Sequence, residues 1–89
     1  MLSLEYATRF KRDFKLIQKR GLEIGLLQEA IALLAREVPL PEKFHDHALA
    51  GNWRGFRECH IRPDWLLIYK AEAGTLLLYR TGTHSDLFR

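Results

Sequence analysis

The second half of the sequence concentrates side chains that can move protons and hold a phosphate. Three histidines, an aspartate that follows a proline, and an arginine near a predicted strand end lie between positions 47 and 84. The candidate catalytic residues are His47, His60, Asp64, Arg80 and His84. Imidazoles exchange protons near neutral pH, and a guanidinium stabilises charge that develops on a reacting phosphate. These residue types suit cleavage of an RNA phosphodiester.

Each candidate also has a simpler interpretation. A single histidine is more often a surface or hydrogen-bonding residue than a catalyst. Asp64 after a proline is a common turn residue, and Arg80 could merely pair with a carboxylate. Trp53, Trp65 and Phe88 could stack on unpaired bases, or they could belong to the core or its cover. Residue types alone therefore leave catalysis as one hypothesis among several.

A metal site is a further alternative. His45 and His47 are two residues apart, and with His60 or Asp64 they could bind zinc. This spacing is common by chance, and the sequence contains no zinc motif such as HExxH. We therefore rank a zinc site low, and the family resemblance given below implies that neither a metal ion nor a cofactor is needed.

The elements that must position these residues follow from the apolar pattern. Residues 8–20 carry apolar residues at spacings of four and three, which predicts a helix with Thr8 as its N-cap. Gly21 fits the residue after a helix end, and residues 22–36 have the spacing of a second helix. Prolines at 39 and 41 end it and open a loop that runs to residue 52.

The first helix is the most basic part of the chain. Its Lys11, Arg12 and Lys15 belong to a run of six cations that contains one acid. Closely spaced cations bind a polyanion through counterion release, whereas an ordinary solvated helix face is the alternative. The charge run alone favours the solvated face, and only the family resemblance given below assigns these three residues to substrate binding.

Four segments are predicted to be strands, and short turn signals separate the last three. They are residues 2–6, 53–61, 65–70 and 75–80. The layout β-α-α-β-β-β predicts an α+β fold, in which a helical hairpin packs on one face of an antiparallel sheet. Alternation places Glu58 and His60 on the face opposite Cys59 and Ile61, so His60 lies on the open face if the last two point toward the helices.

Composition limits the number of domains, the cellular compartment and the kind of partner. The 89 residues, 47% of them hydrophobic and 28% charged, are enough for one folded domain, spanning 1–89. The single Cys59 excludes an internal disulfide and favours a reducing compartment. No apolar run approaches the length of a membrane span, so we expect a cytoplasmic protein. A net charge of +3 permits an anionic partner without requiring one.

Two longer segments of the sequence resemble those of a known protein family. The block DHALAGNWRGFRECHIRPDWLLIYK and the later RTGTHSDLF, which together extend from Asp46 to Phe88, resemble the YafQ-like branch of the RelE/ParE superfamily. Members of this branch are bacterial type II toxins that cleave messenger RNA and are held inactive by an antitoxin. The first half agrees in layout and in its basic helix.

The resemblance implies a RelE-like toxin fold and a metal-independent endoribonuclease. The enzyme would enter the ribosomal A site, contact ribosomal RNA, and cut the mRNA with the 2′-hydroxyl as nucleophile. The family's functional positions fall on His47, His60, Asp64, Trp65, Arg80, His84 and Phe88. His45 is not part of the matched motif.

Roles follow as expectations from this resemblance. His84 is expected to be the general acid for the departing 5′-oxygen, and Asp64 or His47 the base for the 2′-proton. His60 would orient the phosphate, and Arg80 would stabilise its charge. Trp65 and Phe88 would position bases.

Two functions of other classes remain open. One is a gyrase inhibitor like the ParE branch, which lacks this set of histidines, and the other is an inactive fold that binds only an antitoxin or RNA. The cognate antitoxin itself is expected to present an acidic segment that folds on binding to the charged open face.

Overall fold

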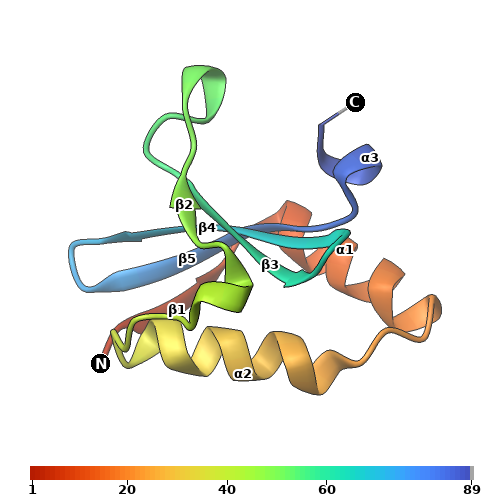
Figure 1. The fold of residues 1–89 in the computed structure, drawn as a ribbon, viewed down its shortest axis with the longest axis horizontal. Coiled ribbons are helices and arrows are strands. Elements are labelled where there is room, and N and C mark those ends of the chain that lie inside the picture. Colours follow the sequence, from red (N-terminus) through yellow and green to blue (C-terminus); the bar gives the residue numbers. More distant parts are fainter. Residues whose placement is uncertain (89) are drawn as a thin grey trace.

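The computed structural model of the chain describes residues 1–88, and it has a five-stranded sheet as its centre (Figure 1). The strands are β1 (Ser3–Tyr6), β2 (His47–Ala48), β3 (Arg57–Arg62), β4 (Trp65–Glu72) and β5 (Thr75–Gly82). Their order across the sheet is β1-β5-β4-β3-β2. The predicted α+β class and three long strands are confirmed, but the strand predicted over residues 53–61 begins only at Arg57, and β2 was not predicted.

The sheet is mixed rather than purely antiparallel as predicted. β2 to β5 pair in antiparallel fashion, but β1 pairs in parallel with the first half of β5. The chain passes through two helices and three strands before β5 forms, so β1 reaches its partner as a distant edge strand and not through a hairpin. A purely antiparallel sheet was therefore wrong at this one edge.

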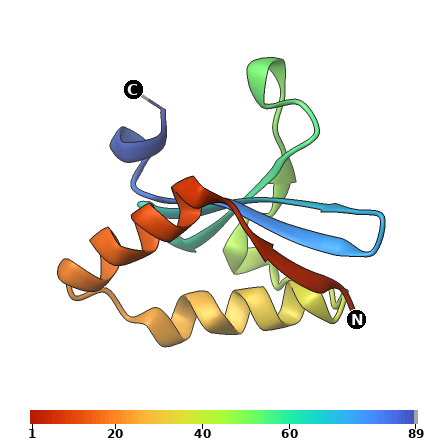
Figure 2. The same ribbon diagram turned by 180° about the vertical axis from the view of Figure 1, so that it is seen from behind.

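Helices α1 (Thr8–Lys19) and α2 (Ile24–Ala35) lie on one side of the sheet, as predicted (Figures 1 and 2). Gly21, with φ of 77°, has the left-handed backbone expected between them. The N-cap of α1 is Ala7 and not Thr8. Because the Ala7 N–H still bonds to the carbonyl of Leu78 on β5, strand β1 continues directly into the helix without a side-chain cap.

The main core lies between the sheet and these helices. It includes Trp65, Leu67 and Tyr69 from β4, and Cys59 from β3. A smaller cluster around Leu66 and Ile68 covers the opposite face of the sheet. The alternation predicted for β3 is confirmed, because Cys59 is buried in the main core and Ile61 packs against it.

Two short arms rise from the face opposite the helices (Figures 1 and 2). One contains β2 and the 3₁₀ turn η2 (Gly51–Trp53), and the other ends in the short helix α3 (His84–Leu87). A further 3₁₀ turn, η1 (Glu42–Phe44), precedes β2. The arms bound the part of the sheet on which most of the histidines gather.

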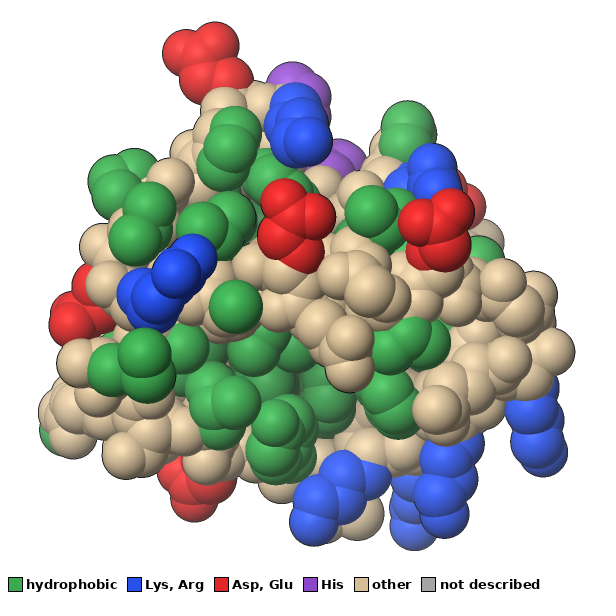
Figure 3. All heavy atoms as spheres, turned by 90° about the horizontal axis from the view of Figure 1, so that it is seen from below, with side chains coloured by type: hydrophobic (Ala, Val, Ile, Leu, Met, Phe, Trp, Pro, Cys, Tyr) green, Lys and Arg blue, Asp and Glu red, His purple; other side chains and the backbone are tan. Residues whose placement is uncertain are grey.

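Figure 3 views the molecule from the side of α2. Apolar side chains occupy the middle of this face, Lys and Arg side chains project along one border, and histidines are visible at the opposite border. No helix within residues 1–88 has both the length and the apolar character needed to cross a bilayer.

Candidate active site

The loop before β2 places two histidines around Asp46, a half-buried anchor. Asp46 accepts hydrogen bonds from the Tyr69 hydroxyl at 2.5 Å and from Arg57 Nε at 3.4 Å. Burial raises the pKa of Tyr69, so its hydroxyl remains a donor. His45 and His47, on either side of this anchor, lie together, and His47 Nδ1 is 2.7 Å from the His45 carbonyl oxygen.

Strand β3 supplies His60 and a carboxylate that serves two imidazoles. The Glu58 side chain is only 8% exposed, and its Oε2 lies 3.1 Å from His47 Nε2 and 3.7 Å from His60 Nε2. The pairing of His47 with Glu58 across β2 and β3 brings these groups together. A buried carboxylate needs such partners, because an unpaired charge in this position is costly.

Helix α3 presents His84 next to Asp64. The Asp64 Oδ1 accepts from the His84 backbone N–H at 2.9 Å and lies 2.7 Å from His84 Nδ1. These contacts, the backbone bond first, lower the pKa of Asp64, which therefore remains a carboxylate. An acceptor at Nδ1 fixes the proton there and leaves Nε2 of His84 directed to a substrate.

Four residues are too few to form a stable helix alone, so α3 depends on its contacts. Thr83 and Asp86 form a capping box, each side chain accepting from the other's backbone N–H. Arg20 at the end of α1 donates to both oxygens of Asp86, at 2.8 and 3.2 Å. Gly82 permits this approach, because a Cβ there would lie 2.8 Å from Asp86 Oδ2.

The imidazoles form a continuous row. Ring centroids are 5.6 Å apart for His45 and His60, 6.3 Å for His47 and His60, and 5.8 Å for His60 and His84. Phe88 continues the row at 6.5 Å from His84. His60 is therefore the centre of a cluster with one carboxylate at each side, Glu58 and Asp64.

Phe88 also connects the two arms. Its ring centroid is 5.5 Å from that of Trp53, which in turn contacts Tyr79 at 5.9 Å and Phe56 at 6.1 Å. Phe88 is 40% exposed, so it has a free ring surface beside His84. That Phe88 contacts a base stays a prediction.

Two predicted site residues of the strands, Trp65 and Arg80, are not in the cluster. Trp65 is 2% exposed within the main core, and its Nε1 donates to the Thr81 hydroxyl at 2.9 Å. Its burial contradicts the expectation that Trp65 positions a base. Its place on β4 follows from alternation, since it shares a face with the buried Leu67.

Arg80 forms a salt bridge with the Asp13 carboxylate, which is the simpler of the two interpretations of this residue. Its Nε and Nη2 donate to Asp13 of α1 at 2.7 and 3.0 Å, which raises the pKa of Arg80 further. Asp13 also accepts from the Thr81 backbone N–H at 3.1 Å. Arg80 therefore anchors α1 along β5 in this structure.

The predicted cations of α1 lie outside the cluster. Lys11, Arg12 and Lys15 are exposed on the helix, and among residues 1–88 none of the three forms an ion pair. Within this same part of the chain, no three His, Cys, Asp or Glu residues are arranged to hold a metal ion. The zinc alternative thus has no preformed cluster.

Sequence reasoning missed three residues that organise the site. Glu58 was placed on the correct face but given no role, although its spacing of two from His60 was the available signal. Asp13 and Asp86 act over 67 and 66 positions on Arg80 and Arg20, and no local pattern reveals such pairs.

Comparison with known proteins gives consistent matches over nearly the full chain. Residues 2–89 match the family described as "Bacterial toxin of type II toxin-antitoxin system, YafQ". The mRNA interferase toxin YafQ of Escherichia coli is 43% identical over 86 residues, which cover 96% of this chain and 94% of that protein.

Solved structures of similar chains have the same fold. The E. coli DinJ-YafQ complex contains a chain that is 41% identical, with a TM-score of 0.93 and full coverage of both chains. A metal-bound toxin from Helicobacter pylori is 43% identical, with a TM-score of 0.93 over 99% of this chain and 100% of that one.

Proposed function

This chain belongs to the YafQ family of toxins from bacterial type II toxin-antitoxin systems, and on that premise we propose that it is an mRNA interferase that cleaves messages in the ribosomal A site. The observation that carries the proposal is the row of imidazoles centred on His60, with Asp64 bonded to His84 at one end and Glu58 facing His47 at the other. Cleavage of a phosphodiester by its neighbouring hydroxyl needs one acid and one base on either side of a phosphate.

His84 is the proposed general acid. Its Nδ1 is held by Asp64, so the proton that reaches the departing 5′-oxygen comes from Nε2. Asp64 supports the imidazolium that donates this proton, because a carboxylate stabilises the charged ring. This assignment makes Asp64 the partner of the acid and not the base.

His60 is the proposed general base for the 2′-hydroxyl. Asp64 is occupied by His84, and both nitrogens of His47 face acceptors, the His45 carbonyl oxygen and Glu58. His60 lies between these groups and its Nε2 is 3.7 Å from Glu58, beyond a hydrogen bond. His47 then contributes by holding Glu58 and the His45 loop in place beside His60.

The proposed reaction balances without a metal ion. His60 takes the proton of the 2′-hydroxyl, the 2′-oxygen forms a bond to phosphorus, and the bond from phosphorus to the 5′-oxygen breaks. His84 protonates that oxygen. The two products carry a 2′,3′-cyclic phosphate and a 5′-hydroxyl. Treating the protein with EDTA before it is added to magnesium-supplied ribosomes should leave the cleavage rate unchanged.

Other residues have supporting roles in this proposal. Phe88 stacks on a base next to the scissile phosphate, since aromatic rings bind bases without strict sequence preference. Arg80 acts at a distance by fixing α1, and it reaches a phosphate only if it leaves Asp13. Lys11, Arg12 and Lys15 contact ribosomal RNA phosphates through exposed side chains.

A cognate antitoxin is the proposed protein partner. The related E. coli toxin is seen in a complex with DinJ. An acidic segment that folds over the histidines and the arm with Phe88 would neutralise this face and block access to it. The proposed target implies the bacterial cytoplasm as the place of action.

The test is to add the purified protein to an mRNA, first naked and then on programmed ribosomes, and to map the new 5′ ends. We expect cuts only on ribosomes, each with a 5′-hydroxyl, and their loss in His84→Ala. If the folded protein makes no cuts in either sample, the interferase proposal is wrong, and a gyrase supercoiling assay then separates the gyrase inhibitor from the inactive binder.

A further inference from the structure

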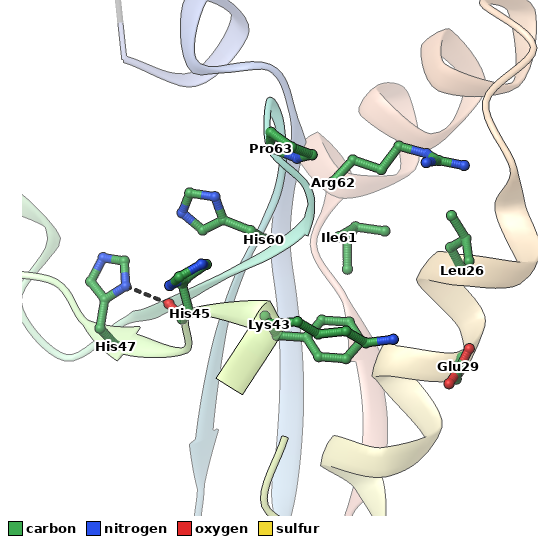
Figure 4. Close-up of a pocket in the computed structure, with 10 residues that line it drawn as sticks. Leu26, Glu29, Lys43, His45, His47, His60, Ile61, Arg62 and Pro63 are labelled. Atoms are coloured by element: carbon green, nitrogen blue, oxygen red, sulfur yellow. Dashed lines mark hydrogen bonds between the residues drawn. The ribbon is translucent and has the colours of Figure 1, made fainter. Parts of the chain in front are cut away.

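A cavity of about 800 Å³ opens beside the histidine row, on the side away from α3 (Figure 4). This size is within the range of roughly 300–1,000 Å³ that small-molecule sites occupy. Its lining comes from α2, η1, the loop before β2 and the end of β3. His47 and His60 belong both to this lining and to the proposed catalytic cluster, so the cavity continues the active site.

The lining has the composition of a site for a flat ring with a charged attachment. Leu26, Phe44 and Ile61 supply apolar surface. Lys43 and Arg62 supply cations and Glu29 supplies one carboxylate, and the Lys43 Nζ lies 5.4 Å from the Phe44 ring centroid. Arg62 also donates to Glu23 at 3.4 Å, a long contact between exposed side chains that a phosphate can replace. Apolar and aromatic walls with a few polar groups are typical of ligand pockets, and cations at the rim favour a phosphate.

His45 stands at the mouth of this cavity and has no role in the proposed reaction. Its backbone is left-handed, with φ of 46°, a conformation uncommon for residues other than glycine. The bond from Asp46 to Tyr69 and the contact of His47 with the His45 carbonyl oxygen hold the loop in this form. Backbone strain of this kind persists where the surroundings enforce it, and it gathers at functional sites.

The ring of His45 is also placed for stacking. It meets the His60 ring edge to face, with centroids 5.6 Å apart and an interplanar angle of 69° (Figure 4). One ring face thus remains for a partner next to the atoms that His60 would deprotonate. Unpaired bases are recognised by stacking on aromatic side chains, histidine among them.

We propose that this cavity is a nucleotide-binding subsite, in which His45 stacks on the base of an mRNA nucleotide that flanks the scissile phosphate. Lys43 and Arg62 hold the adjoining backbone phosphate. The subsite rests on the proposed function, since its ligand is the message that the histidine row cleaves. It makes His45 a substrate-binding residue, not a catalytic one.

The test uses ribosomes programmed with messages whose A-site codon carries an abasic ribonucleotide at one position at a time, so that the 2′-hydroxyl remains. The maximal single-turnover rate and the half-saturating protein concentration are measured for the unsubstituted protein and for His45→Asn. Asparagine tolerates a left-handed backbone but has no ring to stack. We expect His45→Asn to raise the half-saturating concentration about tenfold and to change the maximal rate less than about twofold.

The abasic messages identify the base. At one position, base removal should weaken the unsubstituted protein by a similar factor, and His45→Asn should then add no further effect, because the two changes remove the same stacking interaction. Glu37→Asn is the matched control, since Glu37 also has a left-handed backbone, with φ of 59°, and does not line the cavity. It should behave like the unsubstituted protein, and thermal unfolding confirms that each variant is folded.

Two other outcomes would overturn the subsite. In the first, the half-saturating concentration of His45→Asn equals that of the control. In the second, His45→Asn raises the half-saturating concentration by the same factor whether or not a base has been removed, and does so at every codon position. If the unsubstituted protein cleaves no message on ribosomes, the proposed function fails and the subsite fails with it. Cleavage by that protein together with an unaffected His45→Asn contradicts the subsite alone.

Discussion

The bond between Asp64 and His84 determines what each of these residues can do. A carboxylate that holds Nδ1 cannot also collect a proton from the far side of a phosphate, so in the proposed mechanism Asp64 is the partner of the acid His84. Glu58 has the matching position near His47 and His60, but it is buried whereas Asp64 is exposed. The cluster thus combines one solvent-facing and one buried carboxylate with the imidazoles between them.

Replacing Asp64 by Asn should lower the cleavage rate about a hundredfold, because the imidazolium of His84 loses its charged partner. The pKa of Asp64 is lowered from an ordinary value of about 3.9, so its carboxylate is ionised at both pH 6 and pH 8. Single-turnover cleavage on programmed ribosomes at pH 7 measures this loss. A rate within about twofold of the unsubstituted protein would contradict the support that Asp64 gives to His84. Ser85→Ala, on the same short helix, is the control and should leave the rate within about twofold.

Cys59 illustrates the opposite situation, a titratable group that the site does not use. Burial, with smaller effects from Asp46 and Glu58, raises the pKa of this thiol to about 12. Its thiolate fraction at pH 8 is therefore far below that of an ordinary cysteine, and the side chain has no exposed surface. We expect iodoacetamide to label Cys59 only in denaturant, as measured by mass spectrometry. Rapid labelling of the folded protein would contradict this burial.

At the scale of elements, α3 owes its position to α1. The Arg20 side chain reaches Asp86 across 66 positions, and the capping box with Thr83 completes the helix. Replacing Asp86 by Asn should lower the free energy of unfolding at pH 7 by about 1 kcal/mol, a modest value because Arg20 is 38% exposed.

The same pair predicts a dependence on pH. The Arg20 hydrogen bond lowers the pKa of Asp86 in the folded protein, so the stabilisation is complete above the unfolded value of about 3.9 and is lost as pH falls through the lowered pKa. Urea unfolding at pH 7 and pH 3 should show that the difference between the protein and Asp86→Asn shrinks at pH 3. Glu72→Gln, in an exposed pair with Lys70, should change stability by only a few tenths of a kcal/mol at either pH.

The long helices and strands could be predicted because each contains several repeats of the apolar spacing typical of its type. Two helices and three strands of at least six residues met that condition, and the alternation in β3 also placed His60 correctly. β2 has two residues and α3 has four, too few to display a period. The parallel pairing of β1 depends on a strand more than 70 positions away, which no local pattern encodes.

The candidate site also contains residues that could be predicted from the sequence and residues whose positions could not. Family resemblance identified His47, His60, Asp64, His84 and Phe88, all of which the structure brings together. It specifies residue types without the direction of each side chain, and so it could not reveal that Trp65 is in the core or that Arg80 is bound by Asp13.

At the scale of the whole molecule, the exposed cations of α1 and the histidine row occupy different parts of the surface. Reversing Lys11, Arg12 and Lys15 to Glu should therefore weaken ribosome binding without altering the chemistry. The slope of log affinity against log salt should fall by about three, one for each phosphate that the helix no longer neutralises. Filter binding at several salt concentrations measures this slope, and Arg36→Glu, just beyond the end of α2, is the control. An unchanged affinity at low salt would contradict the assigned role of α1.

The parallel pairing of β1 with β5 has a consequence for how this toxin is made. The first strand of the chain, Ser3–Tyr6, has its partner at residues 75–78, and His84 and Phe88 follow later still. During synthesis the sheet stays open at that edge, and His84, the proposed acid, is missing from the histidine row, until these segments have left the exit tunnel. A nascent copy whose residues 75–88 are still inside the ribosome therefore cannot complete the proposed site, and this delay gives the cell time to supply an antitoxin.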